Sequence, residues 1–296
     1  MKHAIAVDIG GTKTSVVLMD SDFKTYSQVD FPTPRDYEDA SEKIRKTVEN
    51  LDPKGNLPIG IALCGLLSRD NKELLLAPNL SWKNLSLKEL FHWIDGDFKV
   101  VNDGTAAAWA SYILGGKKDY RLLSVTFGTG VGGGLVMYGN LILGAGELGH
   151  IKLDPQGAAC GCGSRGCLET FAGGRHLPSR ALEWEGLNVE TACELGKLAN
   201  DGSEAALRCF KKMGSIAGYA LAGVVNLNGI GTISIGGGLA NASGHFFMDS
   251  LKESLKENLM VPDKQNPTIH FSQSKRNMSL MGAGAVVINP PPNLQT

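Results

Sequence analysis

The chain has 296 residues, a length that fits two medium-sized lobes better than one core or three domains. Hydrophobic residues make up 43%, charged residues 20%, and the formal net charge is -1, so the composition indicates a soluble globular protein and argues against nucleic-acid or membrane partners. We expect a cytoplasmic protein, because the sequence shows neither a signal peptide nor a segment long and apolar enough to span a bilayer.

The predicted elements fall into two similar series. The first has strands at residues 3–9, 14–19, 23–31, 59–63 and 99–101 and helices at 37–51, 85–93 and 103–114. The second has strands at 122–127, 135–138, 141–143 and 232–235, an irregular stretch at 145–170, helices at 190–200, 203–226, 245–257 and 280–288, and an extended proline tail. The repeated order predicts two related α/β lobes, with ligands beyond the carboxyl ends of the strands. We assign residues 1–116 and the returning segment 279–296 to a small lobe, and residues 117–278 to a large one.

The first strand runs into a polar turn, Asp8-Ile9-Gly10-Gly11-Thr12-Lys13. The amides of Gly10 and Gly11 and the hydroxyl of Thr12 suit phosphate oxygens, and Asp8 suits Mg²⁺. Lys13 would neutralise developing charge. The alternative is a plain hairpin with glycines for tightness.

Two further glycine turns follow predicted strands. Residues 128–134 contain a G-x-G-x-x-G match, but a strand rather than a helix is expected next, so we reject a dinucleotide fold and assign Gly128, Thr129 and Gly130 to ATP. At residues 236–238 an adenosine group would lie against the bare backbone of Gly237 and Gly238. A crowded helix–strand junction is the alternative there.

Asn102-Asp103 ends one predicted strand and begins a helix. An isolated Asp in this place is ordinarily an N-cap. Because Asp103 is expected to face the same cleft as the glycine turns, we interpret it as the base that takes the proton of a sugar hydroxyl. Asn102 would bind a neighbouring hydroxyl.

Three of the six cysteines are closely spaced, as Cys160, Cys162 and Cys167, with His150 upstream. Three thiolates and one imidazole make a closed tetrahedral zinc site, whereas a disulfide would leave one thiol unpaired. We expect the zinc loop to hold Glu147 and Glu169 rigidly for hydrogen bonds with sugar hydroxyls. Surface salt bridging is the alternative for both. The remaining Cys64, Cys193 and Cys209 are predicted to be buried.

Together these motifs resemble the ROK family of repressors and sugar kinases, in order and over nearly the whole chain. The most specific match is Cys160-Gly161-Cys162-Gly163-Ser164-Arg165-Gly166-Cys167-Leu168-Glu169, with Glu147-Leu148-Gly149-His150 upstream. The resemblance implies a two-lobed, actin-like ATPase fold of the ribonuclease-H-like type with a central interlobe cleft. It also implies that ATP, Mg²⁺ and a structural Zn²⁺ are used, and that the chain forms a homodimer.

By matching position, the resemblance implies that Asp103 is the catalytic base, that Asn79, Asn102, Glu147, His150 and Glu169 bind sugar, and that His150, Cys160, Cys162 and Cys167 bind zinc. In one departure, Ser81 stands before Trp82 where many members carry Gly. The expected reaction is phosphorylation of glucose to glucose 6-phosphate, with N-acetylmannosamine, N-acetylglucosamine or fructose as alternatives.

A sugar-sensing regulator without catalysis is the alternative from another class. Repressors of the family carry a helix-turn-helix ahead of the Asp-Ile-Gly-Gly motif, and Asp8 leaves no room for one here. Asp8, Thr12 and Asp103 occur together, which favours catalysis over a silent sugar-binding protein.

Overall fold

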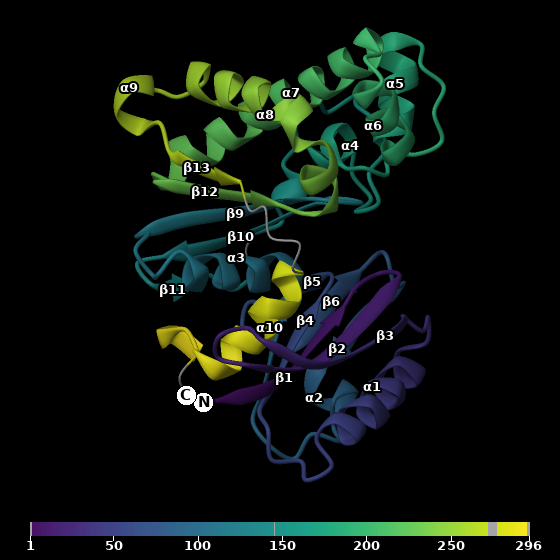
Figure 1. Cartoon of the computed structure of the whole chain (residues 1–296), viewed down its shortest axis with the longest axis vertical. Helices are drawn as coiled ribbons and strands as arrows, with labels where there is room; N and C mark the ends of the chain where they lie inside the picture. Colours follow the sequence, from purple (N-terminus) through teal and green to yellow (C-terminus); the bar gives the residue numbers. More distant parts are fainter. Residues whose placement is uncertain (1, 145, 272–276, 295–296) are drawn as a thin grey trace. The chain divides into compact units, whose positions relative to one another are not determined.

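The computed structural model describes residues 2–144, 146–271 and 277–294. It divides into two compact units, whose elements are labelled in Figure 1. The first comprises Met1–Lys118, Gly134–Gly146 and Arg276–Thr296, and the second Asp119–Gly133 and Glu147–Lys275. Residues 134–146 therefore group with the first unit, whereas the sequence-based division placed them in the large lobe.

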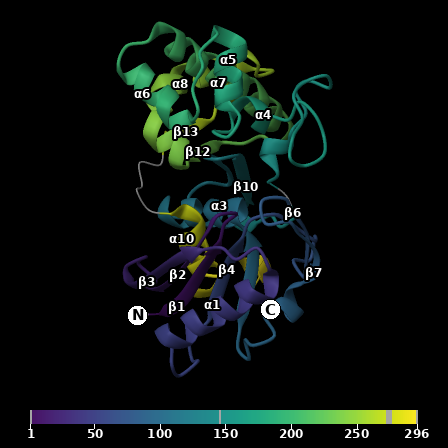
Figure 2. The same ribbon diagram turned by 90° about the vertical axis from the view of Figure 1, so that its right-hand side faces the viewer.

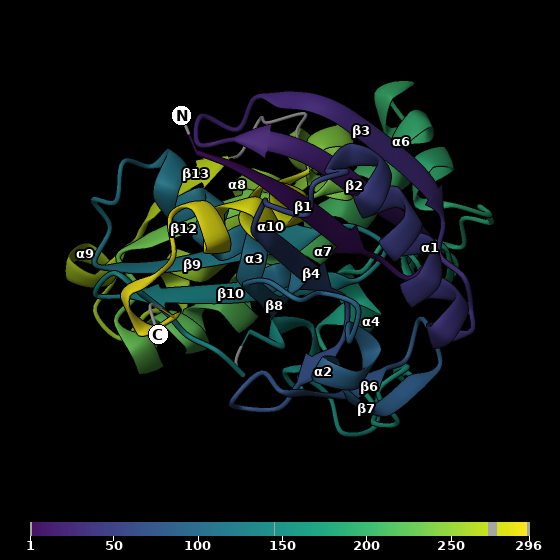
Figure 3. The ribbon, with the colours of Figure 1, turned by 90° about the horizontal axis from the view of Figure 1, so that it is seen from below.

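The first unit is built on a five-stranded mixed sheet in the order β3-β2-β1-β4-β8 (Figure 3). Apolar residues fill β1 and β4 almost completely, as expected for strands that are covered on both faces. β1 pairs antiparallel with β2 and parallel with β4, and β4 pairs parallel with β8. The strands are β1 His3–Ile9, β2 Lys13–Asp20, β3 Thr25–Pro32, β4 Ile59–Leu63 and β8 Phe98–Asn102.

Helices cover both faces of this sheet. On one face lies α1 (Tyr37–Leu51), which packs Ala40, Ile44 and Val48 into the core with β1 and β4. On the other lies α10 (Met278–Ile288), which contacts β1, β4 and α3 (Asp103–Leu114) (Figure 1). A small side sheet has the order β5-β6-β7 and is followed by α2. These elements are β5 Leu66–Leu67, β6 Glu73–Ala77, β7 Trp82–Ser86 and α2 Leu87–Leu90.

Glycines let α10 approach its neighbours closely. A Cβ on Gly60 in β4 would stand 2.6 Å from the carbonyl carbon of Ala283, and one on Gly282 would stand 2.8 Å from the Cα of Ala106 in α3. Real Cβ atoms do not reach such distances without a backbone shift. The end of the chain is thereby fitted into the core of the first unit.

The second sheet repeats the arrangement of the first, with the order β11-β10-β9-β12-β13. β12 pairs parallel with β9 and with β13, and β11 is the antiparallel partner of β10. The strands are β9 Arg121–Phe127, β10 Val131–Met137, β11 Asn140–Leu141, β12 Thr232–Gly236 and β13 Thr268–Phe271. The predicted duplication of an α/β pattern therefore corresponds to two sheets of matching strand order.

The helices of the second unit surround the long pair α7 and α8 (Figure 2). Ser203 caps α7 and Gly229 ends it with a left-handed φ of 60°, which matches the usual start and stop signals. The helices are α4 Glu169–Ala172, α5 Leu177–Glu185, α6 Ala192–Asn200, α7 Glu204–Asn228, α8 Gly238–Glu257 and α9 Pro262–Gln265, with one 3₁₀ turn, η1, at Leu148–His150. Within the described ranges no helix has the length and apolar character needed to cross a membrane.

Several local predictions were wrong. The helix expected at 85–93 shrinks to the single turn α2 (Leu87–Leu90), because residues 82–86 pair with β6 as strand β7. α8 begins at Gly238 rather than at 245, since packing of its first turns, with Ser243 against Gly196 of α6 and Gly244 against Phe271 of β13, outweighs their poor helix propensity. The prolines lead into a 3₁₀ turn, η2 (Pro292–Leu294), rather than an extended tail. Cys193, expected to be buried, is exposed.

Candidate functional site

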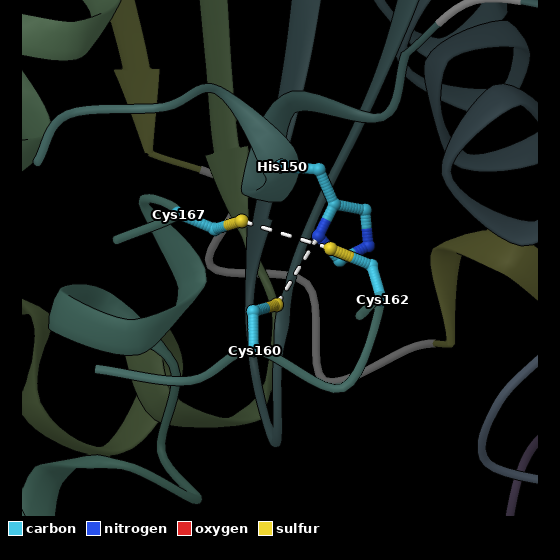
Figure 4. Close-up of side chains that lie close together, drawn as sticks. All are labelled: His150, Cys160, Cys162 and Cys167. Atoms are coloured by element: carbon cyan, nitrogen blue, oxygen red, sulfur yellow. Dashed lines mark hydrogen bonds between the residues drawn. The ribbon is translucent and has the colours of Figure 1, made fainter. Parts of the chain in front are cut away.

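The predicted metal ligands converge in the second unit. The ligand atoms of His150, Cys160, Cys162 and Cys167 all lie within 4.8 Å of one another, and their side chains point toward a common centre (Figure 4). The sulfurs of Cys162 and Cys167 are 3.7 Å apart, and the sulfur of Cys160 is 3.6 Å from Nδ1 of His150. The sequence therefore identified a set of residues that the fold brings together.

These separations fit a tetrahedral zinc ion. With Zn–S bonds of about 2.3 Å and Zn–N bonds of about 2.0–2.1 Å, a tetrahedron has S···S edges of about 3.8 Å and S···N edges of about 3.6 Å. Both short separations in the cluster match these edges. The donor set, three soft thiols and one imidazole, is also the one that zinc prefers in closed structural sites.

Backbone bridges fold the cysteine segment into a compact loop. Lys152 bridges to Cys167, and Ala159 bridges to Arg165. Nζ of Lys152 lies 3.1 Å from the sulfur of Cys167 and 3.9 Å from that of Cys162. An ammonium group in this place would offset the excess negative charge of three thiolates around a divalent cation.

The imidazole of His150 has its two nitrogens in different surroundings. Nδ1 faces the thiols, whereas Nε2 lies 3.8 Å from a carboxylate oxygen of Glu147. Both residues belong to or flank the 3₁₀ turn η1, and both are partly buried. A metal on Nδ1 would leave Nε2 and the Glu147 carboxylate as a pair of polar groups that could meet a ligand hydroxyl.

Glu169 is held against the glycine turn between β9 and β10. Its Oε2 accepts a hydrogen bond of 3.1 Å from the backbone N–H of Val131. Glu169 begins α4 directly after Cys167-Leu168, so the cysteine loop fixes where that helix starts. The Glu169 carboxylate therefore contacts the glycine turn that we assigned to ATP, and Glu169 directly follows the cysteine loop that we assigned to zinc.

The turn at residues 128–130 has a fixed shape. Gly128 donates to the carbonyl of Gly130 (3.0 Å), Gly174 donates to the carbonyl of Gly128 (2.9 Å), and Arg175 donates to that of Thr129 (2.9 Å). A preformed turn of this kind suits an anion, because little ordering remains when the ligand arrives.

A pocket of about 670 Å³ opens beside this turn, lined among others by Gly128, Thr129, Lys197, Gly238 and Leu239. Gly237 precedes α8 with a φ of 99°, where a Cβ would meet the backbone of Phe127, so only glycine fits. The N-terminus of the 20-residue helix α8 is thus bare backbone at the pocket, an arrangement that suits phosphate groups. The pocket volume is of the size found for small-ligand sites.

Asp103 lies in the first unit, at the carboxyl end of β8. Asn102, not Asp103, is the N-cap of α3: its side-chain oxygen accepts from the N–H of Thr105 at 3.1 Å, and its amide donates to the carbonyl of Gly65 at 2.9 Å. The carboxylate of Asp103 accepts from the N–H of Gly104 at 2.8 Å. Burial raises the pKa of Asp103 above its ordinary value, a direction that makes its carboxylate a stronger proton acceptor.

Asp8, at the end of β1, is near enough to Asp103 for the two charges to interact. Burial, with a further contribution from the charge of Asp103, raises the pKa of Asp8 to about 7, although a hydrogen bond from Asn277 (2.6 Å) opposes the shift. A cation held by Asp8 would favour the ionised carboxylate and so lower the pKa of Asp8. Lys13 is paired with Asp30 at 3.2 Å on the surface.

Sequence reasoning missed Asn277. It caps α10, accepting from the N–H groups of Ser279 and Leu280, while its amide donates to Asp8, 269 residues away. The pattern Asn before an apolar helix was visible as a cap signal, but its partner depends on the sheet and helix packing of the whole unit. Asn79, by contrast, was predicted, and it is exposed in the loop between β6 and β7.

Comparisons with known proteins agree with this geometry. The ROK family model matches residues 4–289. The glucokinase of Streptomyces coelicolor is 32% identical, with 99% of both chains covered, and the N-acetylmannosamine kinase of Citrobacter koseri is 32% identical over 81% of this chain and 85% of its own. A Streptomyces griseus ROK glucokinase, solved with glucose and AMPPNP, superposes with a TM-score of 0.81 at 28% identity over 96% of this chain and 98% of its own. The fold is therefore the actin-like, two-domain ATPase fold of ROK sugar kinases.

Proposed function

The chain belongs to the ROK family and is a sugar kinase of it, and from this premise we propose that it transfers the γ-phosphoryl group of ATP to a hydroxyl of a hexose. Glucose is the first candidate substrate and glucose 6-phosphate the product, because the relative that is similar over 99% of both chains is a glucokinase. N-acetylmannosamine is the second candidate, because kinases for that sugar are also similar over most of the chain. Among the features of the site, the carboxylate of Asp103 carries the proposal: it lies at the carboxyl end of β8, near enough to Asp8 for their charges to interact, and burial raises its pKa above the ordinary value.

In the proposed reaction, Asp103 orients the sugar hydroxyl and accepts its proton as the oxygen bonds to the γ-phosphorus. The bond between that phosphorus and the β–γ bridging oxygen breaks, and ADP leaves with the electron pair. Asn102 would bind a neighbouring hydroxyl; hydrogen bonds to Gly65 and Thr105 hold its amide in place next to Asp103.

The second unit supplies most of the proposed sugar-binding groups. Glu147, Nε2 of His150 and Glu169 would hydrogen-bond the sugar hydroxyls, and Asn79 of the first unit would add one more contact. Carboxylates accept from several hydroxyls at once, so they can distinguish hexoses by the directions of those hydroxyls.

The nucleotide is gripped by backbone amides in the proposed arrangement. Gly10, Gly11 and Thr12, and Gly128, Thr129 and Gly130, would hold phosphate oxygens, and the pocket beside Gly237 and Gly238 would take the adenosine group. Lys13 would leave its surface pair with Asp30 to meet the phosphates. Mg²⁺, with Asp8 as its protein ligand, would neutralise phosphate charge.

A coupled assay for ADP release, run with a panel of hexoses, tests this function. Sugar-dependent ADP release is expected, with glucose giving the highest kcat/KM and Asp103→Asn lowering kcat at least 100-fold without unfolding the chain. Full turnover by that variant would remove Asp103 from its role. A wild-type chain that binds a sugar without releasing ADP would instead be a sugar-sensing regulator.

Zinc and the oligomeric state are measured on the same purified protein. One zinc ion per chain is expected by elemental analysis, and Cys162→Ser should lose it and weaken sugar affinity more than nucleotide affinity, because Glu169 and His150 depend on the loop. An active wild-type protein that contains no zinc would refute the metal assignment. Light scattering is expected to give the mass of a homodimer, as is common in the family.

A further inference from the structure

In each unit, a glycine of a phosphate turn makes room for a side chain expected to bind sugar. In the second unit the pair is Gly130 and Glu169. A Cβ on Gly130 would overlap Oε2 of Glu169 and stand 3.0 Å from its carboxyl carbon. The same oxygen accepts the hydrogen bond from Val131, so the carboxylate is pressed onto the turn by a specific contact.

The first unit shows the same arrangement with different residues. A Cβ on Gly11 would stand 2.6 Å from the Cβ of Asn79, well inside van der Waals contact. The loop that carries Asn79 is fixed from its other side, because Arg35 donates to the carbonyl of Asn79 at 2.6 Å and Trp82 donates to the carbonyl of Arg35 at 2.6 Å. Asn79 is therefore held between Arg35 and Gly11.

These contacts are not a general property of glycine turns. A Cβ on Gly128, two residues before Gly130, would meet no described atom within 4 Å. Neither Gly11, Gly128 nor Gly130 has the left-handed φ that would require glycine on backbone grounds. The need for glycine at positions 11 and 130 therefore comes from the neighbouring side chain.

We propose that Gly11 and Gly130 are positioning residues of the sugar site: each leaves the space in which Asn79 or Glu169 takes its sugar-binding position. The inference rests on the proposed function, because it takes Asn79 and Glu169 as sugar ligands. According to this inference, Gly11 and Gly130 affect sugar affinity as well as ATP binding, and the effect on sugar affinity does not require a bound nucleotide.

The test measures glucose and N-acetylmannosamine binding by calorimetry in the absence of nucleotide. Gly130→Ala is expected to raise the sugar Kd at least 10-fold, because the new methyl group must push the Glu169 carboxylate out of place. Gly128→Ala is the matched control and should leave the sugar Kd within about twofold of the wild type. Equal sugar affinity in Gly130→Ala and wild type would overturn the inference.

A stability measurement separates this inference from the proposed function. In thermal unfolding, Gly130→Ala should lower the Tm when Glu169 is present and have little effect in a Glu169→Ala background, where the overlapping carboxylate is gone. If Gly130→Ala alone does not fold, the double variant should fold. Equal losses in both backgrounds would refute the contact, whereas a wild type that binds no hexose would refute the function and leave this result standing.

In the first unit the same stability test can be made more specific, because the atom that a Cβ on Gly11 would overlap is the Cβ of Asn79. Gly11→Ala should be destabilising in the wild type and equally so in an Asn79→Ala background, which keeps the Cβ. An Asn79→Gly background removes that atom and should relieve the cost. If the two backgrounds behave alike, Gly11 does not act through Asn79.

Discussion

Ser81 lies in a backbone conformation that L-residues seldom adopt. Its φ is 62°, in the turn that connects Asn79 to the buried Trp82. Glycine adopts this region without steric cost, whereas a Cβ there costs about 1–2 kcal/mol. Glycine, which the family resemblance led us to expect before Trp82, would avoid this strain; the serine keeps the left-handed turn and bears its cost.

Replacing Ser81 by glycine should therefore stabilise the protein. We expect Ser81→Gly to raise the free energy of unfolding by about 0.5–1 kcal/mol, because relief of the left-handed strain exceeds the added backbone entropy of glycine. Urea denaturation measures the change. Ser81→Ala is the control and should bring no gain, because it keeps the Cβ. A loss of stability in Ser81→Gly would show that the serine hydroxyl, not the backbone, decides the matter.

The buried position of Asp8 lowers the stability of the folded chain when its carboxylate is ionised. Burial, opposed by the hydrogen bond from Asn277, raises its pKa from 3.8 to about 7. Because the folded-state pKa exceeds the unfolded value, folding takes up a proton between about pH 4 and pH 7. The contribution of Asp8 to stability therefore falls as the pH rises through this window.

Asp8→Asn should remove that pH dependence. At pH 8, without Mg²⁺ or nucleotide, we expect the variant to be more stable than the wild type by on the order of 4 kcal/mol, with the advantage shrinking toward pH 4. Its kinase activity should be lost. Denaturation curves at several pH values test this, and Asp30→Asn on the surface controls for general charge effects. An advantage that is the same at every pH would contradict the shifted pKa.

The elements that were predicted well are those whose own residues determine their secondary structure; the others depend on packing against distant segments. α3 was predicted with its observed bounds because a polar start and Gly115 frame an alanine-rich run. β7 was not, since five residues with mixed character become a strand only by pairing with β6. Similarly, the first turns of α8 contain Gly, Asn and Ser, and they are helical because α6 and β13 pack against them.

Because one side of α7 contacts α8 and the other is exposed, we predict that replacing glycine by alanine changes stability in opposite directions on the two sides. Gly218 faces α8, where a Cβ would overlap the carbonyl of Leu251 and stand 2.8 Å from the nitrogen of Leu255. Gly223 lies on the exposed side, where a Cβ would meet nothing within 4 Å among the described residues. We expect Gly218→Ala to destabilise by about 2–4 kcal/mol and Gly223→Ala to stabilise by about 0.5–1 kcal/mol. Thermal unfolding checks both, and a stabilised Gly218→Ala would mean that the helices separate easily.

Contacts in the candidate site could be predicted where the residues are close in the sequence. They could not be predicted where the residues meet only after the whole chain has folded. The grouping of His150 with Cys160, Cys162 and Cys167 could be predicted because loop spacing limits what the side chains can reach. The pairing of Asp8 with Asn277 could not, since it exists only when the end of the chain returns to the first sheet. The glycines at 11 and 130 were noticed, but the side chains that they accommodate come from 39 to 68 positions away in the sequence.

That return of the chain predicts how the first unit depends on its last segment. α10 places Leu280, Met281, Val286 and Ile288 in the core, and Trp109 of α3 donates to the carbonyl of Asn289 at 2.9 Å. A chain that ends at residue 275 loses these contacts and the cap that holds Asp8. Because α3, β1 and β4 would then expose an apolar surface to water, we expect the first unit to lose cooperative unfolding and become sensitive to proteases.

Limited proteolysis with mass spectrometry measures this region by region. Cleavage of the 275-residue chain should concentrate in the segments of the first unit, and the cysteine loop of the second should still bind zinc. A chain that ends at Asn289 is the matched control: it loses the hydrogen bonds between Asn293 and Leu141 but keeps α10, so it should unfold cooperatively. If the shorter chain were equally protected, α10 would be an addition to a core complete without it, and the close approach that Gly60 and Gly282 permit would have no role in stability.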